Sequence, residues 1–301
     1  MRHFLSLLDY SRDELIHLLD RADALRDLWL LHTMPQCLDG QQVGLWFYGQ
    51  GFRNRLAFEI GAKAMGGQVS YVPGELGVHE PLEDVGHYLA NWYDLLVVRT
   101  ARHEDLYTLA ASTPVPVINA RTNSSHPCEI MGDLQFIRQR RGSLDGLKMV
   151  FVGEVTNLCM SWFEAAVRFP IHIIQVAPDG YQAADAVLRR MNDGALGEIA
   201  VSADLDAALT GVDLIYTDCW PKVNDTLSKD RIRELFLPYQ ITAAHVARLH
   251  EAAMFLPCPP VTRGEEVSAE AMQSRLCLNY AAKDNLLHAQ NAIMELLAGG
   301  G

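Results

Sequence analysis

An arginine at the start of a predicted helix is the clearest chemical signal in this sequence. Residues 43–59 predict a short apolar strand, a glycine-containing turn and the opening of a helix that carries Arg53 and Arg55. The N–H groups of the first helical turn lack intrahelical acceptors, and together with the helix dipole they favour an anion. The guanidinium of Arg53 adds a planar, permanent charge that suits phosphate or carboxylate. Two interpretations are open at this point: an anion site at Arg53, or surface charges on an amphipathic helix. For Arg55 we expect a surface charge or a structural ion pair.

Two further side chains of this kind follow predicted strands. Arg99 ends the apolar run Asp94–Arg99, and His126 comes after the run Pro116–Ala120. In open parallel sheets, ligands bind beyond the carboxyl ends of the strands. We therefore expect Arg53, Arg99 and His126 to converge on one crevice.

The elements that position these residues alternate between strand and helix. The pattern Ser11–Arg12–Asp13–Glu14 is a capping box that predicts a helix start. Further predicted helices are 84–91, 160–167, 183–193, 240–253 and 279–297, and further predicted strands are 68–72, 148–152, 171–176, 214–218 and 254–257. This alternation indicates α/β architecture with parallel sheets covered on both faces. We predict two doubly wound domains, residues 1–142 and 146–275, with a hinge near residue 145.

Composition narrows the classes of function. The chain has 301 residues and a net charge of −12, and no basic cluster stands out, which argues against nucleic-acid binding. No apolar run is long enough to span a bilayer, and the N-terminus lacks a signal-peptide pattern. The six cysteines form no CxxC pair, so we expect neither a metal site nor a disulfide framework. These features favour a cytoplasmic protein without a membrane partner.

The order of several short motifs resembles the aspartate/ornithine carbamoyltransferase family along nearly the whole chain. The family's phosphate loop Ser-Thr-Arg-Thr-Arg corresponds to Gly51–Arg55, its strand-end arginine to Arg99, and its His-Pro-x-Gln motif to His126–Glu129. Residues 257–260, the segment 263–267 and the tail 279–294 resemble the family's His-Cys-Leu-Pro motif, its Arg-Gly-Glu-Glu-Val segment and its C-terminal helix.

The resemblance implies a homotrimer with active sites at subunit interfaces and no cofactor. It implies a carbamoyl-phosphate domain, to which the helix 279–299 returns, and an acceptor domain. Donor binding falls to Gly51, Phe52, Arg53, Asn54, Arg99, His126 and Glu129, among which Arg53, Arg99 and His126 are the expected catalytic residues. Acceptor binding falls to Asn157, Asp218, Cys258, Pro259 and Arg263, and Glu75 matches a residue that ornithine enzymes contribute from the neighbouring subunit.

The sequence departs from the family mainly at residues that are expected to bind the donor and the acceptor. Gly51 and Phe52 lack the loop's hydroxyls, and Asn54 offers an amide instead. Each hydrogen bond lost to a charged ligand costs about 1.5–3 kcal/mol. Glu129 replaces a glutamine and brings a carboxylate toward the donor, unless it is turned away or paired with an arginine. Residues 221–223, Pro-Lys-Val, replace the Ser-Met-Gly of ornithine enzymes, so an ornithine-like acceptor is not supported.

Three functions are therefore open. The first is a divergent carbamoyltransferase that moves a carbamoyl or related group from a phosphorylated donor to an amine. The second is a catalytically silent paralogue that serves as a structural or regulatory subunit. The third is a site adapted to a cationic ligand such as a guanidine or amidine, for which carboxylates at Glu129 and Glu75 would be suited.

Overall fold

The computed structural model describes residues 2–49, 51–224 and 226–299. The chain divides into two compact units, Met1–Arg140 with Lys283–Gly301, and Arg141–Ala282. Each unit is built around one parallel sheet, which confirms the predicted fold class of two doubly wound α/β domains.

The first unit holds a four-stranded sheet in the order β2-β1-β3-β4. Its strands are β1 (Gln42–Phe47), β2 (Gln68–Pro73), β3 (Leu95–Arg99) and β4 (Val117–Arg121). Its helices are η1 (Leu7–Asp9), α1 (Arg12–Leu30), α2 (Phe52–Ala64), α3 (Leu82–Leu89), α4 (His103–Ser112) and α5 (Pro127–Arg141), of which the last residue belongs to the second unit.

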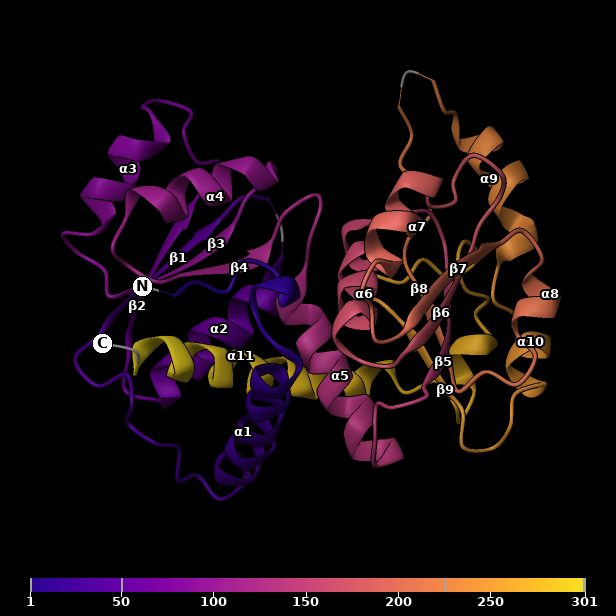
Figure 1. Ribbon diagram of the computed structural model, residues 1–301, viewed down its shortest axis with the longest axis horizontal. Helices are drawn as coiled ribbons and strands as arrows, with labels where there is room; N and C mark the ends of the chain where they lie inside the picture. The colour runs from indigo at the N-terminus through magenta and orange to yellow at the C-terminus, as the bar shows by residue number, and fades with distance from the viewer. Residues whose placement is uncertain (1, 50, 225, 300–301) are drawn as a thin grey trace. The chain divides into compact units, whose positions relative to one another are not determined.

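Helices cover both faces of this sheet (Figure 1). On one face, α3 and α4 pack their apolar side chains onto Leu96, Val98 and Val117. On the other lie α2, α5 and the last helix, α11 (Asn279–Ala298). The central strands β1 and β3 are largely buried between these helices, which is why they consist mostly of apolar residues.

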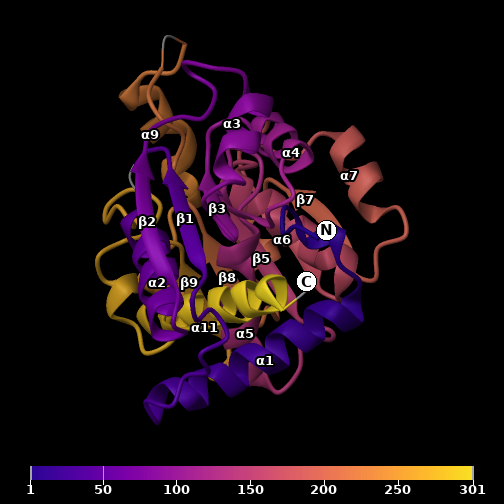
Figure 2. The same cartoon turned by 90° about the vertical axis from the view of Figure 1, so that its left-hand side faces the viewer.

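The C-terminal helix returns to the first unit, as predicted. From Lys283 onward α11 lies beside α5 and α1 (Figure 2). The approach is close at Gly132 of α5, where an added Cβ would lie 3.0 Å from the backbone of Leu286. An ion pair between Arg21 and Glu295 joins α1 to the end of α11. Figure 2 also shows α2 on this side of the sheet.

The second unit holds a five-stranded sheet in the order β7-β6-β5-β8-β9. Its strands are β5 (Lys148–Val152), β6 (His172–Val176), β7 (Glu198–Ser202), β8 (Leu214–Thr217) and β9 (Met254–Pro257). Its helices are α6 (Asn157–Arg168), α7 (Asp185–Asn192), α8 (Leu205–Ala208), α9 (Lys229–Phe236), η2 (Leu237–Tyr239), α10 (Ala243–Ala247) and η3 (Ala271–Gln273). One sheet face packs against α8 and α10, and the other receives Trp162 of α6 against Tyr216.

The local predictions were correct for most elements and wrong for some. The capping box at Ser11 is present, with the Glu14 carboxylate accepting from the Ser11 N–H at 2.8 Å. The helix predicted over 240–253 is wrong, because only Ala243–Ala247 is helical and turns follow it. The strand β7 and the helices α4, α8 and α9 were not predicted.

Candidate functional site

The loop after β1 places the start of α2 at the carboxyl edge of the first sheet. The helix begins at Phe52, and its N-cap, Gly51, provides no side-chain hydrogen bond to the first-turn N–H groups. Those groups and the helix dipole therefore favour an anion at this end. The Arg53 guanidinium stacks over the Phe52 ring at 4.7 Å, and the ring itself is 59% exposed. Phe52 thus supports the guanidinium through its aromatic face.

Arg99 lies against this loop. It is the last residue of β3, its Nε donates to the Tyr48 carbonyl at 3.2 Å, and its guanidinium covers Gly51. An added Cβ at Gly51 would stand 2.8 Å from Nη1 of Arg99. Burial first, and then the charge of Arg121, lower the pKa of Arg99 to about 10. Arg99 therefore remains a cation at neutral pH.

His126 is buried at the start of α5 and comes within the electrostatic reach of the same cations. Burial lowers its pKa to about 3, and Arg99, Arg121 and Lys283 contribute in the same direction, while Glu129 opposes them. At neutral pH the imidazole is therefore uncharged and can donate one N–H. The three residues predicted to converge do follow neighbouring strands, since β1, β3 and β4 are adjacent in the sheet.

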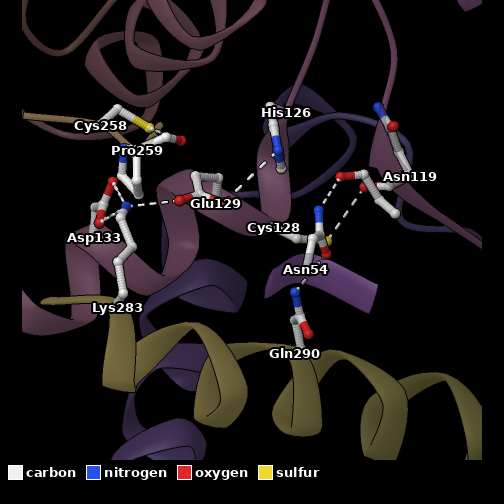
Figure 3. Close-up of polar contacts among 11 residues, drawn as sticks. Asn54, Asn119, His126, Cys128, Glu129, Asp133, Cys258, Pro259, Lys283 and Gln290 are labelled. Carbon is white, nitrogen blue, oxygen red and sulfur yellow. Dashed lines mark hydrogen bonds and ion pairs between the residues drawn. The ribbon is translucent and has the colours of Figure 1, made fainter. Parts of the chain in front are cut away.

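The Glu129 carboxylate forms an ion pair with a lysine that the sequence did not point to. Lys283 of α11 lies 2.7 Å from Glu129 and 2.7 Å from Asp133, and all three side chains are largely buried (Figure 3). His126 Nε2 lies 3.7 Å from the other Glu129 oxygen. Burial raises the pKa of Glu129, but Lys283, His126 and Arg53 act against it and leave the pKa below its usual range. The alternative in which Glu129 is paired inside the chain is therefore supported, with Lys283 as the partner instead of Arg53 or Arg99.

The Asn54 side chain makes hydrogen bonds within the first unit. Its Nδ2 donates to the Ala120 carbonyl at 2.7 Å, and its Oδ1 accepts from Gln290 of α11 at 2.7 Å (Figure 3). The side chain is 4% exposed. The amide that we expected to contact phosphate therefore ties α2 to β4 and α11, which leaves the backbone N–H of Asn54 as its contribution to an anion.

Two other predicted residues of the first unit lie on the surface of the chain. Glu75 is exposed in the loop after β2. Arg55 forms an ion pair with Glu59 at 3.2 Å and stacks on Tyr71, which fits the structural role expected for it.

The acceptor residues of the second unit follow three adjacent strands. Asn157 opens α6 after β5, Asp218 follows β8, and Cys258 and Pro259 follow β9. Asn157 and Cys258 are buried, and the Asp218 carboxylate accepts from the N–H of Cys219 at 2.8 Å. Arg263 is exposed, and its guanidinium lies 3.4 Å from the Tyr280 hydroxyl.

Two carboxyl groups that were not predicted as site residues lie within electrostatic reach of Asp218. Burial raises the pKa of Glu154, and the charge of Asp218 raises it further. Burial also raises the pKa of Glu266 to about 7, against an opposing hydrogen bond from the Thr262 N–H at 2.6 Å. This edge of the second sheet is therefore acidic.

A metal site, a membrane-spanning helix and a separate pocket would each require a particular arrangement of the described residues. Among the residues that the structure describes, no three His, Cys, Asp or Glu side chains are placed to hold a metal ion. No helix in the described ranges is long and apolar enough to cross a membrane. A hollow of about 360 Å³ lies at the amino-terminal edge of the second sheet, near Lys148, His172 and Thr210, and contains none of the predicted site residues.

Comparison with known proteins identifies the family. The model for the "Aspartate/ornithine carbamoyltransferase, carbamoyl-P binding domain" matches residues 2–139, and that for the "Asp/Orn binding domain" of the same family matches residues 145–297. The chain belongs to the aspartate/ornithine carbamoyltransferase family. The resemblance inferred from the short motifs is thereby confirmed.

Several members of this carbamoyltransferase family are similar over their full length. The anabolic ornithine carbamoyltransferase 1 of Pseudomonas savastanoi pv. phaseolicola is 32% identical, over 98% of this chain and 96% of the relative. The ornithine carbamoyltransferase of Halorhodospira halophila is 34% identical over 100% of both chains. The solved ornithine carbamoyltransferase of Pyrococcus furiosus has a TM-score of 0.93 and 28% identity, covering 100% of this chain and 98% of that one.

Proposed function

We propose that this protein transfers a carbamoyl group from carbamoyl phosphate to an amine. The observation that carries the proposal is the gathering of Arg53, Arg99 and a neutral His126 after the adjacent strands β1, β3 and β4. Two guanidinium groups and the first turn of α2 suit a phosphate dianion. The relatives named above are ornithine carbamoyltransferases, and this supports the same reaction class.

In the proposed reaction, the amine nitrogen attacks the carbamoyl carbon and gives a tetrahedral oxyanion. His126 donates its N–H to that oxygen, and Arg53 and Arg99 hold the phosphate. The intermediate then loses phosphate as its C–O bond breaks, and the nitrogen releases a proton. Donors fixed in place where charge develops act without reorganisation, and a neutral imidazole needs no protonation step.

The ion pair of Glu129 bears on the alternative functions. Because Lys283 lies 2.7 Å from this carboxylate and also pairs with Asp133, the charge of Glu129 is partly compensated inside the chain. That weakens the case for a guanidine or amidine ligand, which would need an uncompensated carboxylate. It also removes one objection to a dianionic donor. The remaining alternative is a silent paralogue, for which the missing loop hydroxyls are the motivating observation.

On the acceptor side, Asp218 and its acidic surroundings suit an amine that arrives as an ammonium ion. The relatives are named for ornithine, so ornithine is the first acceptor to test. The Pro-Lys-Val at 221–223 predicts that a different amine serves better.

We propose that the chain acts as a homotrimer. The exposed face of α2 supports self-association, because Phe52, Leu56 and Ile60 recur every fourth residue and are 59%, 38% and 45% exposed. Light scattering after gel filtration tests this. We expect a trimer for the wild type and a smaller species for Leu56→Lys, and a monomeric wild type would contradict the proposal.

Calorimetric titration with carbamoyl phosphate tests the donor site, with inorganic phosphate as the reference ligand. We expect submillimolar binding that is lost in Arg53→Ala and retained in Arg55→Ala, because Arg55 is paired with Glu59 on the same helix. The absence of heat at millimolar ligand would overturn the proposal. Binding without turnover across a panel of amines would instead favour the silent paralogue.

A further inference from the structure

A second arginine stands opposite Arg99 at the carboxyl edge of the first sheet. Arg121 is the last residue of β4, and its Cα pairs in register with that of Arg99 on β3. The pairing becomes irregular just before this point: Asn119 pairs with Val98, whereas Arg99 pairs with Arg121, so Ala120 is the extra residue. An extra residue of this kind re-aims the side chain that follows it. Here it brings Arg121 onto the level of Arg99.

Gly51 completes the arrangement from the neighbouring loop. An added Cβ there would meet the Arg99 guanidinium at 2.8 Å from Nη1 and 2.9 Å from Cζ, distances that side chains do not tolerate without movement. The Arg99 guanidinium therefore occupies the space into which a larger side chain at 51 would project. The serine of the family's phosphate loop does not fit at this position unless Arg99 shifts.

Two guanidinium groups at the same level of adjacent strands both attract an anion that binds beside them. The charge of Arg121 acts on both Arg99 and His126, and Glu129, whose charge opposes it at both groups, is held by Lys283. A dianion bound at this edge would be stabilised by Arg53, Arg99 and Arg121 together.

We propose that Arg121 is a further phosphate-binding residue of the donor site. In this arrangement Arg121 supplies a cation that compensates for the missing hydroxyl ligands of the loop, and the Arg99 guanidinium lies over Gly51, where a larger side chain would displace it. The inference rests on the proposed function, since it assumes that the anion held at this edge is the donor's phosphate group. It deepens that proposal by assigning a residue outside every motif from which the family resemblance was drawn.

Calorimetric titration of Arg121→Gln with carbamoyl phosphate and with inorganic phosphate tests this role. One lost charge-assisted contact predicts binding weaker by about 10- to 100-fold for both ligands. Arg121→Lys, which keeps the charge, should recover part of the loss, and circular dichroism with a thermal melt checks the fold. The matched control is Arg102→Gln, which removes an equal charge from a 73% exposed side chain paired with Asp105.

The outcomes separate the two proposals. No binding of either ligand by the wild type would overturn the proposed function and this inference with it. Binding by the wild type and equally by Arg121→Gln would overturn only the role of Arg121. A general salt or charge effect would weaken Arg102→Gln as much as Arg121→Gln, and that result also contradicts the inference.

The role of Gly51 has its own test. Gly51→Ser restores a family hydroxyl, so a loop that had merely lost its ligands should bind phosphate more tightly after this change. We expect weaker binding instead, because the new side chain displaces the Arg99 guanidinium. Tighter binding by Gly51→Ser would overturn this part of the proposal.

Discussion

The carboxyl edges of the two sheets have the same architecture and opposite charge. After β1, β3 and β4 the first sheet carries Arg53, Arg99 and Arg121, whereas after β5 and β8 the second carries Glu154 and Asp218. Parallel strands make both edges suitable for ligands. The difference indicates that a few residues at the strand ends decide which ligand charge each edge favours, and in the proposed function the first edge takes the anionic donor and the second the cationic amine.

The two edges also treat a buried glutamate in opposite ways. Glu129 keeps its charge because Lys283 pairs with it, so its pKa lies below the usual range. Burial raises the pKa of Glu266 to about 7, with Asp218 as a further charge that disfavours ionisation. The ion pair with Lys283 therefore keeps Glu129 charged at the edge of the first sheet, whereas burial favours the uncharged form of Glu266 at the edge of the second.

Breaking the pair in the basic edge should have the largest effect. Lys283→Met leaves Glu129 and Asp133 buried without their cation, and removing one partner of a buried pair costs about 3–5 kcal/mol. Chemical denaturation should show this loss. Lys63→Met is the matched control, since Lys63 pairs with Glu59 at an exposed site and should cost less than about 1 kcal/mol. Adding Glu129→Gln to Lys283→Met should restore part of the stability, and no restoration would contradict the pairing.

The second-largest effect is expected from removing His126, the neutral hydrogen-bond donor at the carboxyl edge of the first sheet. His126→Ala should lower kcat by about 10²- to 10³-fold, as expected for loss of one oxyanion donor. Because burial lowers the pKa of His126 to about 3, wild-type kcat should show no step from this residue between pH 5 and pH 8. A protonated, cationic role for His126 would instead produce a fall in kcat as the pH rises through that range.

On the acidic edge, Asp218→Asn should impair the acceptor and spare the donor. The isosteric amide can keep accepting from the Cys219 N–H, so the turn is preserved while the charge is lost. We expect the KM for the amine to rise by about tenfold or more, with carbamoyl phosphate binding unchanged. Asp193→Asn, at an exposed position in the same unit, is the control. Equal effects on donor and acceptor would contradict the division of charge between the edges.

Much of the fold could be predicted because most of its strands are buried apolar runs separated by polar turns. The strand β7 lacks this signal, since Ile199 is its only buried residue. The helix predicted over 240–253 was too long because the local sequence signal there was misleadingly strong. Its alanine-rich sequence favours a helix, but the chain must turn after Ala247 to enter β9 at Met254, and tertiary structure overrides propensity.

The site could be predicted only where a residue follows a strand in a known motif. Arg53, Arg99 and His126 meet that condition. Arg121 could have been noticed as an arginine at a strand end, but its alignment with Arg99 depends on an irregular register that no local pattern shows. Lys283 lies 154 positions after Glu129 in the sequence, and only the return of α11 brings the two together.

The smallest expected effect sharpens the contrast between the two glutamates. The pKa of Glu266 is about 7 in the folded state and lower in the unfolded chain. At a pH between these two pKa values, the folded protein therefore keeps Glu266 protonated while the unfolded chain has lost that proton. Ionising Glu266 therefore costs stability as the pH rises toward 7, and below the unfolded pKa this cost vanishes. Glu266→Gln removes the charge and keeps an oxygen for the Thr262 N–H, so it should raise Tm at pH 8 by on the order of 2 °C and leave it unchanged at pH 4. The mirror variant Glu129→Gln should give no such gain at pH 8, because there the charge is stabilised by Lys283. A matching gain in both variants would mean that the two edges do not differ in how they hold a buried carboxylate.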